Sequence, residues 1–537
     1  MINMREPGQI ELFDYYQSRM SVVAYKTLSS GYYALFRSVI LSVLPAKELS
    51  VNFEAVFGAP TKELYSMAGL TLLKEFHNWT AQEAAEAYMF DIRVHFALNL
   101  GSDNLSCTSR TVERYLKLIR EDDLAIKIFD DVTETLIKEL DLKIDQQRLD
   151  STHVFSDMAT FSRTKLMGVT VKRFLVQLKR HETESYEALP EALLKRYEKR
   201  ENALFADVSK NKEKRSSLRQ EVAEEMHDLV QRFSGNEKIE NMHTYKQLVT
   251  IFVQQCEVID NIKVTEADSP KDKNDESGNN TPESDEKTES DDKSENDGKS
   301  ENDDSENVVV RAKTGGNVIQ NPSDPDATYD GHKGVGYQVQ IAETSNPENA
   351  VQLVTSILPQ TAVESDANAL IPVLSDLEKK GILPESMLAD TLYGGDENVV
   401  NAQEMGVDLV SPVPGPPPKK KSEEPTEKQQ RLQKRREEQE TEEWRKEYNS
   451  RAQIEGTIGS IKRRTSMVRL RYRGKSSVFA AICLKLAGWN ISRALKSARI
   501  KEKLAKITPK YTGKLRNCLP CVSLLFECVF SRRMKAN

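Results

Sequence analysis

The sequence predicts an α/β fold: a sheet covered by helices, a helical region before it and a helical insertion within it. Short alternating or apolar runs typical of strands recur between helical stretches in the second half of the chain. The first part of the chain, and a long tract after the first predicted strand, show helical periodicity instead. With 537 residues, the chain is long enough for several domains and a large hydrophobic core.

Residues 1–140 are predicted to form a helical N-terminal domain. Thr80 and Glu83 have the spacing of a capping box, in which two side chains satisfy free amides at a helix start. A second helix, over residues 110–120, carries a basic stripe formed by Arg110, Arg114, Lys117 and Arg120. The stripe fits helix-turn-helix docking on DNA, and it fits an ordinary solvated helix surface equally well.

A strand is predicted over residues 147–154, within a segment (141–156) that begins the sheet, and it contains the polar cluster Asp150-Ser151-Thr152-His153. A helical insertion follows over residues 157–262. An acidic linker over 263–308 comes next; from Glu266 to Glu306 it has 17 Asp and Glu against 5 Lys. Because this stretch has few apolar residues, we expect it to be disordered and dispensable for catalysis.

Residues 309–500 are predicted to complete the sheet domain. Tyr337–Ile341 alternates strictly, as a half-buried strand does. Further strands are predicted at 351–358, 387–390 and 407–410, and a helix at 365–380 contains Pro372, which the pattern does not explain. After a proline-rich break, a highly charged helix runs through Glu455, and residues 501–537 form a basic tail.

Charge is distributed unevenly along the chain. The net charge is −7, but the stretch from Glu266 to Glu306 accounts for −12 of it, which leaves +5 elsewhere. From Tyr448 to Asn537 there are 21 Lys and Arg against 3 Glu. A basic end of this kind suits binding to a phosphate backbone, although a solvated tail has the same composition. We predict a cytoplasmic protein, because neither a secretory signal nor a membrane span is recognisable and the six cysteines form no disulfide framework.

Three acids stand where a metal site could form. Asp150 and Asp390 lie in or at the end of predicted strands, and Glu455 lies on a helix. Magnesium prefers such oxygen ligands, and two ions held by a few carboxylates can activate the attacking oxygen and stabilise the leaving oxygen at a phosphodiester. Taken alone the triplet is a weak signal, because the chain has 83 acids.

The third acid has a more specific context. Tyr448, Arg451, Glu455 and Lys462 follow the spacing Y-x2-R-x3-E-x6-K, which predicts one helical face with a hydroxyl, a guanidinium, a carboxylate and an ammonium. Two more cations, Arg463 and Arg464, follow directly. A carboxylate flanked by phosphate-binding cations is suited to positioning a DNA strand. An exposed helix with ordinary ion pairs is the alternative.

With these motifs the chain resembles DDE transposases of the bacterial and archaeal insertion-sequence type that carry a Y-R-E-K signature. Residues 148–153 and 388–395 resemble the strands with the first and second Asp, and residues 451–463 resemble the Glu helix. Residues 324–337 are similar to the segment leading into the second strand, and 109–115 to part of the terminal DNA-binding region.

The resemblance implies an RNase-H-like catalytic core in which Asp150, Asp390 and Glu455 bind metal and catalyse the reaction. It implies two Mg²⁺ ions, with Mn²⁺ as a substitute. It also implies that the protein binds double-stranded DNA at inverted-repeat element ends, cleaves it and joins it to target DNA. The partners would be element ends, target DNA and further copies of the chain in a homodimer or larger synaptic complex, associated with the nucleoid and not with a membrane.

Other functions remain open at this stage. The chain could be an RNase-H-like nuclease without strand transfer, or a silent DNA-binding protein derived from a transposase, or a helical scaffold. The first two acids stand 240 residues apart, more than a bare core requires, and we assign the excess to the insertion and linker. Cys518 and Cys521 form a single CxxC, which lacks the further ligands of a structural zinc site.

Overall fold

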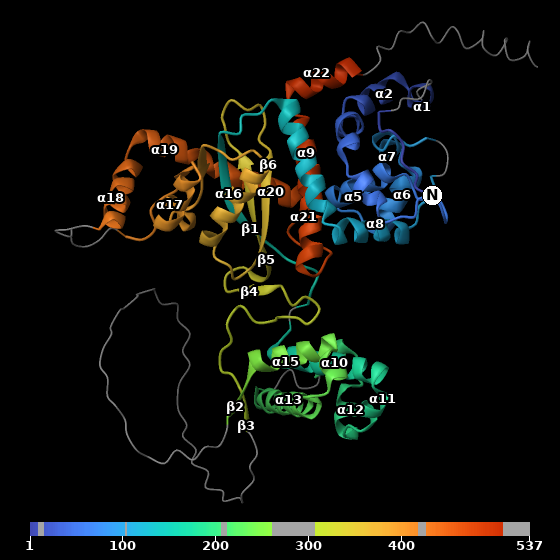
Figure 1. The fold of residues 1–537 in the computed structure, drawn as a ribbon, viewed down its shortest axis with the longest axis vertical. Coiled ribbons are helices and arrows are strands. Elements are labelled where there is room, and N and C mark those ends of the chain that lie inside the picture. The colour runs from blue at the N-terminus through green and yellow to red at the C-terminus, as the bar shows by residue number, and fades with distance from the viewer. Residues whose placement is uncertain are drawn as a thin grey trace, which may run out of the picture. The chain divides into compact units, whose positions relative to one another are not determined.

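The chain forms two compact units (Figure 1), one built from Met1–Thr160 and Ile319–Asn537 and the other from Phe161–Val318. The structure is a computed structural model. It describes residues 1–8, 15–101, 105–159, 161–205, 212–259, 307–416 and 426–507. The acidic tract Glu266–Glu306 and the pair Cys518 and Cys521 lie outside the described residues, as does the tail beyond residue 507.

A mixed sheet forms the centre of the larger unit, with its main strands in the order β6-β5-β1-β7-β8. The strands are β1 (Gln146–Val154), β5 (Gly334–Thr344), β6 (Val354–Thr361), β7 (Ser386–Leu388) and β8 (Asp408–Val410). Strand β5 runs antiparallel to both β1 and β6, whereas β1, β7 and β8 are parallel. Short β4 (Thr328–Asp330) forms a hairpin with the start of β5. The protein is therefore mixed α/β, as the sequence predicts.

The predicted strand at 351–358 begins later, at Val354. Polar side chains hold the preceding residues in a turn, because the Gln352 amide donates to the carbonyl of Asn346 at 2.8 Å. The predicted helix at 365–380 is a 3-10 turn, η5 (Asp366–Ala369), followed by α16 (Leu370–Lys379). Pro372 stands at the third position of α16, where its missing N–H leaves no helical hydrogen bond unmade.

Helices cover both faces of the sheet. On one face α16 and α17 (Asp396–Glu404) pack against a cluster that includes Leu149, Ala342 and Met387. On the other face Val339 and Ile341 belong to a larger cluster with α9, α20 and α21. These helices are α9 (Leu124–Leu140), α20 (Gln453–Thr465) and α21 (Lys475–Ala494). Residues of alternate parity along β1 and β5 therefore point into two separate cores.

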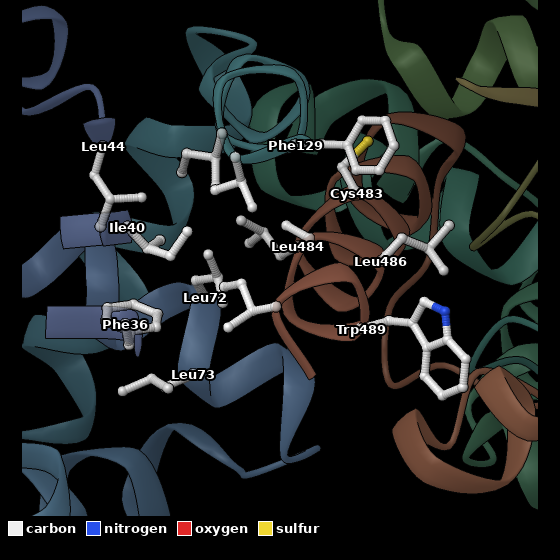
Figure 2. Packing of buried hydrophobic residues seen from close by; sticks show 14 of the residues in the cluster. Phe36, Ile40, Leu44, Leu72, Leu73, Phe129, Cys483, Leu484, Leu486 and Trp489 are labelled. Atoms are coloured by element: carbon white, nitrogen blue, oxygen red, sulfur yellow. The ribbon is translucent and has the colours of Figure 1, made fainter. Parts of the chain in front are cut away.

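The N-terminal helices share the larger core with α21. Figure 2 shows Phe36 and Leu72 of the N-terminal helices and Phe129 of α9 in one cluster with Leu484 and Leu486 of α21. The helices are α1 (Tyr15–Arg19), α2 (Val22–Ser29), α3 (Tyr32–Leu35), a π-turn η1 (Phe36–Ile40), η2 (Leu41–Val43), α4 (Ala46–Ser50), α5 (Leu64–Phe76), α6 (Ala81–Phe90), α7 (Ile92–Ala97) and α8 (Ser109–Glu121). The predicted capping box of Thr80 and Glu83 opens α6.

Helix α21 is buried on most of its surface, including Trp489, as expected of a packing residue. Among the described residues no single helix is long and apolar enough to cross a membrane. Within the described part of the chain, one helix pair, α21 with α22 (Ala498–Ile507), has a suitable length and composition, and the two helices are bent by 82°. The burial of α21 within the core accounts for its apolar composition.

The smaller unit is helical except for one hairpin. Its helices are α10 (Arg163–His181), α11 (Thr183–Glu187), α12 (Glu191–Tyr197), η3 (Glu201–Ala203), α13 (Lys212–Phe233), α14 (Glu237–Glu240) and α15 (His243–Gln255). Strands β2 (Cys256–Ile259) and β3 (Asn307–Val310) pair antiparallel. Arg163 holds the start of α10 to this hairpin, donating to the carbonyl of Arg311 at 2.7 Å. The predicted helical insertion overlaps this unit.

Candidate active site

Two of the three predicted acids lie side by side at the middle of the sheet. Strands β1 and β7 are parallel neighbours, and Arg148 pairs with Leu388 in their register. Asp150 and Asp390 each stand two residues beyond that pair, so the topology brings them together. The Asp390 carboxylate caps a 3-10 turn, η6 (Thr391–Tyr393), and accepts the amide of Thr391 at 2.7 Å.

The guanidinium of Arg451 joins these acids to Glu455. One terminal nitrogen, Nη2, lies 3.8 Å from Asp150 Oδ2 and 3.8 Å from Asp390 Oδ1. The other, Nη1, lies 3.0 Å from Glu455 Oε1. The structure therefore gathers all three predicted carboxylates within 4 Å of one cation, although they lie far apart in the sequence.

The members of this cluster differ in exposure. The side chains of Arg451 and Asp150 are 13% and 17% exposed, whereas those of Asp390 and Glu455 are 43% and 63% exposed. Burial raises the pKa of Asp150, and the negative charges of Asp390 and Glu455 add to this, against the lowering effect of Arg451 and a backbone hydrogen bond. The site is thus an open concentration of negative charge around one half-buried cation.

The signature residues do not lie on one continuous helix. Tyr448 lies on α19 (Glu442–Asn449), Arg451 lies in a 3-10 turn, η7 (Ser450–Ala452), and Glu455 lies on α20. The turn forms where the guanidinium of Arg148, on β1, donates a hydrogen bond to the carbonyl oxygen of Ser450 at 3.0 Å. The break directs Arg451 toward the acids on β1 and β7.

Residues that sequence reasoning missed anchor this turn to the sheet. Arg148 is buried, pairs with Glu343 of β5, and donates to the side chain of Gln453 at 3.0 Å. Glu447 of α19 accepts from Gln146 on β1 at 3.1 Å and from Ser386 on β7 at 3.2 Å. The same two strands that carry the Asp residues thus hold the signature segment. The available signal was an arginine inside the predicted strand, two residues before the first acid.

A polar network lies behind the acids, on the other face of the sheet. Asp366 accepts from Gln338 at 2.5 Å, from Gln340 at 2.7 Å and from Ser151 at 3.2 Å. The Tyr393 hydroxyl donates to the Gln340 side chain. Because Ser151 follows Asp150 and Tyr393 ends the turn that Asp390 begins, the network connects the two segments carrying these acids.

The turn after Asp390 is packed too closely for a side chain at Gly394. A Cβ added there would lie 2.2 Å from the carbonyl oxygen of Pro412. Ser411 completes the packing by donating to the carbonyl of Asp390 at 2.6 Å. The following Gly395, by contrast, has no atom within 4 Å of an added Cβ.

The other predicted DNA contacts on α20 lie in different surroundings. Lys462 is half-buried, and burial together with the nearby charge of Lys333 lowers its pKa. Arg463 is exposed and donates to Ser460 at 3.3 Å, whereas Arg464 lies over the ring of Phe76, 5.5 Å from its centre. Of the three, Arg464 therefore has a packing contact with the N-terminal helices.

Tyr448 is the first residue of the predicted Y-x2-R-x3-E-x6-K spacing. Its ring stacks on Trp444 at 4.8 Å, and burial raises its pKa, with smaller effects from the charges of the site. Beside Glu455 the surface is open: an added Cβ at Gly456 would meet nothing within 4 Å, and one at Gly459 only Arg463 at 3.7 Å. The residues that the structure describes therefore give no packing reason for these glycines.

The predicted N-terminal contacts Arg110, Arg114 and Lys117 are all exposed on α8, away from the buried face. Residues on that buried face are Val112, Tyr115 and Ile119. The stripe is therefore present on the surface, but it does not join the acid cluster. Its fourth member, Arg120, is half-buried and donates to Ser477 at 3.1 Å.

The acid cluster fits divalent cations by the chemistry of its donors. Three carboxylates supply the hard oxygen ligands that Mg²⁺ and Mn²⁺ prefer. Among the residues that the structure describes, however, no group of three His, Cys, Asp or Glu is arranged to hold an ion. Arg451 supplies positive charge among Asp150, Asp390 and Glu455 in this arrangement.

Comparison with known families agrees with this geometry in one part of the chain. Residues 418–495 match a family model described as a transposase DDE domain. The matched stretch contains Tyr448, Arg451, Glu455 and Lys462 but neither strand with an Asp. No curated protein and no solved structure matches the chain. The match supports a DDE transposase, and hence an enzyme with DNA as its substrate.

Proposed function

We propose that the protein is a DDE transposase of the insertion-sequence type. It binds the terminal inverted repeats of its element, cleaves the phosphodiester at each element end and joins the freed ends to target DNA. Asp150, Asp390 and Glu455 are the catalytic carboxylates. In the first step a water oxygen displaces the 3′ oxygen from phosphorus; in the second that 3′ hydroxyl attacks a target phosphodiester and displaces another 3′ oxygen.

The observation that carries the proposal is the meeting of the three acids around Arg451. A chance triplet among 83 acids has no reason to converge on one guanidinium. The antiparallel–parallel strand order around β1 further supports an RNase-H-like core. The family match over 418–495 supports the same reaction class independently of the two Asp residues.

The three carboxylates would hold two Mg²⁺ ions, or Mn²⁺ in their place. Such ions, when bound, activate the attacking oxygen and stabilise the leaving oxygen. The chain itself sets the ligand positions: Asp150 is fixed in β1, and the turn after Asp390 is held by the close packing of Gly394. Glu455 is the most exposed of the three acids and faces the side open to DNA.

In this proposal the cations beside the acids position the DNA. We infer that Lys462 and Arg463 contact phosphates near the scissile bond, and that Gly456 leaves room for the strand next to Glu455. Tyr448 and Arg464 border the same segment. In this proposal Arg451 pairs with the acids until DNA and ions enter, and then takes a phosphate oxygen as partner.

The proposal assigns a role to each part of the chain. Residues 1–140 bind element ends through Arg110, Arg114 and Lys117, residues 141–156 and 309–500 form the catalytic core, and 157–262 is an insertion. Two or more copies assemble on paired element ends, and the protein acts in the cytoplasm at the nucleoid.

A cleavage assay tests the proposal. The substrate is duplex DNA carrying the inverted repeats that flank the gene, with Mg²⁺ or Mn²⁺ present. Asp150→Asn, Asp390→Asn and Glu455→Gln should each abolish cleavage and joining while DNA binding persists, because acids hold metal and cations hold phosphate. Glu404→Gln, at an exposed acid on α17, is the matched control and should cut normally.

Three outcomes would contradict the proposal. Normal cleavage by any acid variant removes that residue from the site. Binding without any cleavage by the unaltered protein favours a silent DNA-binding descendant of a transposase. Cleavage without joined products, on paired ends with target DNA supplied, favours a nuclease that lacks strand transfer.

A further inference from the structure

A groove lies between helix α8 and the segment that connects α4 to α5. It has a volume of about 940 Å³, and Phe53, Phe57, Lys62, Arg110, Arg114 and Lys117 are among the residues that line it. The acid cluster contributes no residue to this groove. The groove is thus a second surface feature of the larger unit, apart from the candidate active site.

The walls of the groove carry an excess of positive charge. Arg110, Arg114 and Lys117 line it from α8, and Lys62 lines it from the connecting segment. Two acids, Glu54 and Glu113, also line it, so cations outnumber acids by two to one. A polyanion fits such a wall better than an apolar partner does.

The connecting segment also exposes large apolar side chains. Phe57 is 80% exposed, Val56 72% and Val51 84%. Phe53, by contrast, is held in place: its ring lies 5.6 Å from that of Tyr115 and under the guanidinium of Arg114 at 5.2 Å. An aromatic side chain exposed beside a basic wall is the combination that binds unpaired nucleic acid, because any base can stack on the ring.

We propose that this groove binds an unpaired stretch of DNA, with phosphates on Arg110, Arg114 and Lys117 and a base stacked on Phe57. The inference rests on the proposed function for the presence of DNA. It deepens that function by assigning Arg110, Arg114 and Lys117 to an unpaired stretch at the element end and by adding Phe57, which has no role in cleavage. Stacking also gives the exposed Phe57 ring a partner that the residues described by the structure do not supply.

Binding measurements on the full-length protein test the groove. The probes are a blunt duplex and the same duplex with a short single-stranded overhang, which carries a fluorescent base analogue. Phe57→Ala should weaken overhang binding about 5- to 150-fold, the loss expected for one stacked base, and leave blunt-duplex binding unchanged. Phe57→Trp should restore it. The analogue should be quenched with the unaltered protein and not with Phe57→Ala.

Phe90→Ala is the matched control, because Phe90 is 77% exposed on α6 and does not line the groove. Arg114→Ala should reduce the slope of log K against log salt for overhang DNA by about 0.7, the value for one phosphate contact on a single strand. Lys138→Ala, at a cation of α9 that pairs with Glu134, should leave the slope unchanged.

The groove assignment fails if Phe57→Ala binds overhang DNA as tightly as Phe90→Ala does, or if both variants lose blunt-duplex binding equally. In either case element-end cleavage by the unaltered protein still stands as a test of the proposed function. Conversely, if the protein binds overhang DNA through Phe57 but never cleaves element ends, the groove assignment is supported and the proposed transposase function is contradicted.

Discussion

Replacing Arg451 by Met removes the guanidinium that the three acids share, while it keeps a side chain of similar length. The guanidinium stands 3.0 Å from Glu455 and 3.8 Å from Asp150 and Asp390. At about 4 Å two unit charges attract by about 1 kcal/mol in water and about 4 kcal/mol at an effective dielectric constant near 20.

Exposure decides where each pair falls in this range. Asp150 is 17% exposed and loses a near-buried partner, whereas Asp390 and Glu455 are 43% and 63% exposed and their attraction is screened by solvent. Some repulsion among the acids also remains unopposed. We therefore expect Arg451→Met to destabilise the metal-free protein by about 1–3 kcal/mol.

The same substitution should favour metal binding. The guanidinium would repel a divalent cation held by these carboxylates. At about 4 Å in water, the repulsion between a doubly charged ion and one positive charge is about 2 kcal/mol, and it is larger in a less polar site. Without Arg451, Mn²⁺ should bind at least tenfold more tightly, and saturating Mn²⁺ should recover the lost stability. Cleavage should nevertheless be slower, because the strand loses a contact that positions it.

Thermal unfolding with a chelator, and calorimetric titration of Mn²⁺ into the DNA-free protein, measure the two effects. Lys434→Met on α18 (Glu427–Gln439) is the control. The Lys434 side chain is 79% exposed, so its removal should change stability and Mn²⁺ affinity far less. If Arg451→Met matches this control in both stability and Mn²⁺ affinity, Arg451 does not balance the charge of the site, and the reasoning is refuted.

Three further predictions address the surroundings of the site. Gly394→Ala should lower stability by about 1–3 kcal/mol and slow cleavage, because its Cβ would lie 2.2 Å from a backbone oxygen, while Gly395→Ala, in open space, should change neither. Burial, helped by nearby arginines, lowers the pKa of His77 to about 4 from 6.5, so its neutral form is favoured on folding. Stability should be full above pH 6.5 and fall by up to about 3 kcal/mol toward pH 4, and denaturant unfolding of His77→Phe should lack that part of the fall. Lys462→Ala should reduce the salt slope of duplex binding by about 1; an unchanged slope would remove it from the DNA contacts.

The parts of the site that local pattern predicts are those that depend on strand ends and spacing. Asp150 and Asp390 could be paired because both stand in or after short apolar strands, and parallel strands place such residues at one edge. Glu455 could be found because its spacing from Tyr448 and Lys462 is specific. The alternation in Tyr337–Ile341 likewise identifies β5.

A sequence pattern does not show which residue contacts which when the two lie far apart in the chain. Helical periodicity places Arg451 on an outer face, and only its neighbours in space show that it points inward among the acids. The 3-10 turn at Ser450 depends on Arg148, which lies 302 residues earlier. Sequence alone also treats residues 1–140 as a separate domain, whereas their helices share a core with α21.

That shared core has a consequence for how the protein is made. Helices α5 and α9 are synthesised early, but the apolar surfaces that face α21 stay uncovered until residues 475–494 leave the ribosome. A chain cut short before α21 therefore lacks the packing partner of its N-terminal helices, and we expect it to be unstable and open to proteolysis. Truncated products would then not accumulate as inactive competitors for DNA, and the surface of α8 would reach its final form only in a chain that also carries the complete acid cluster.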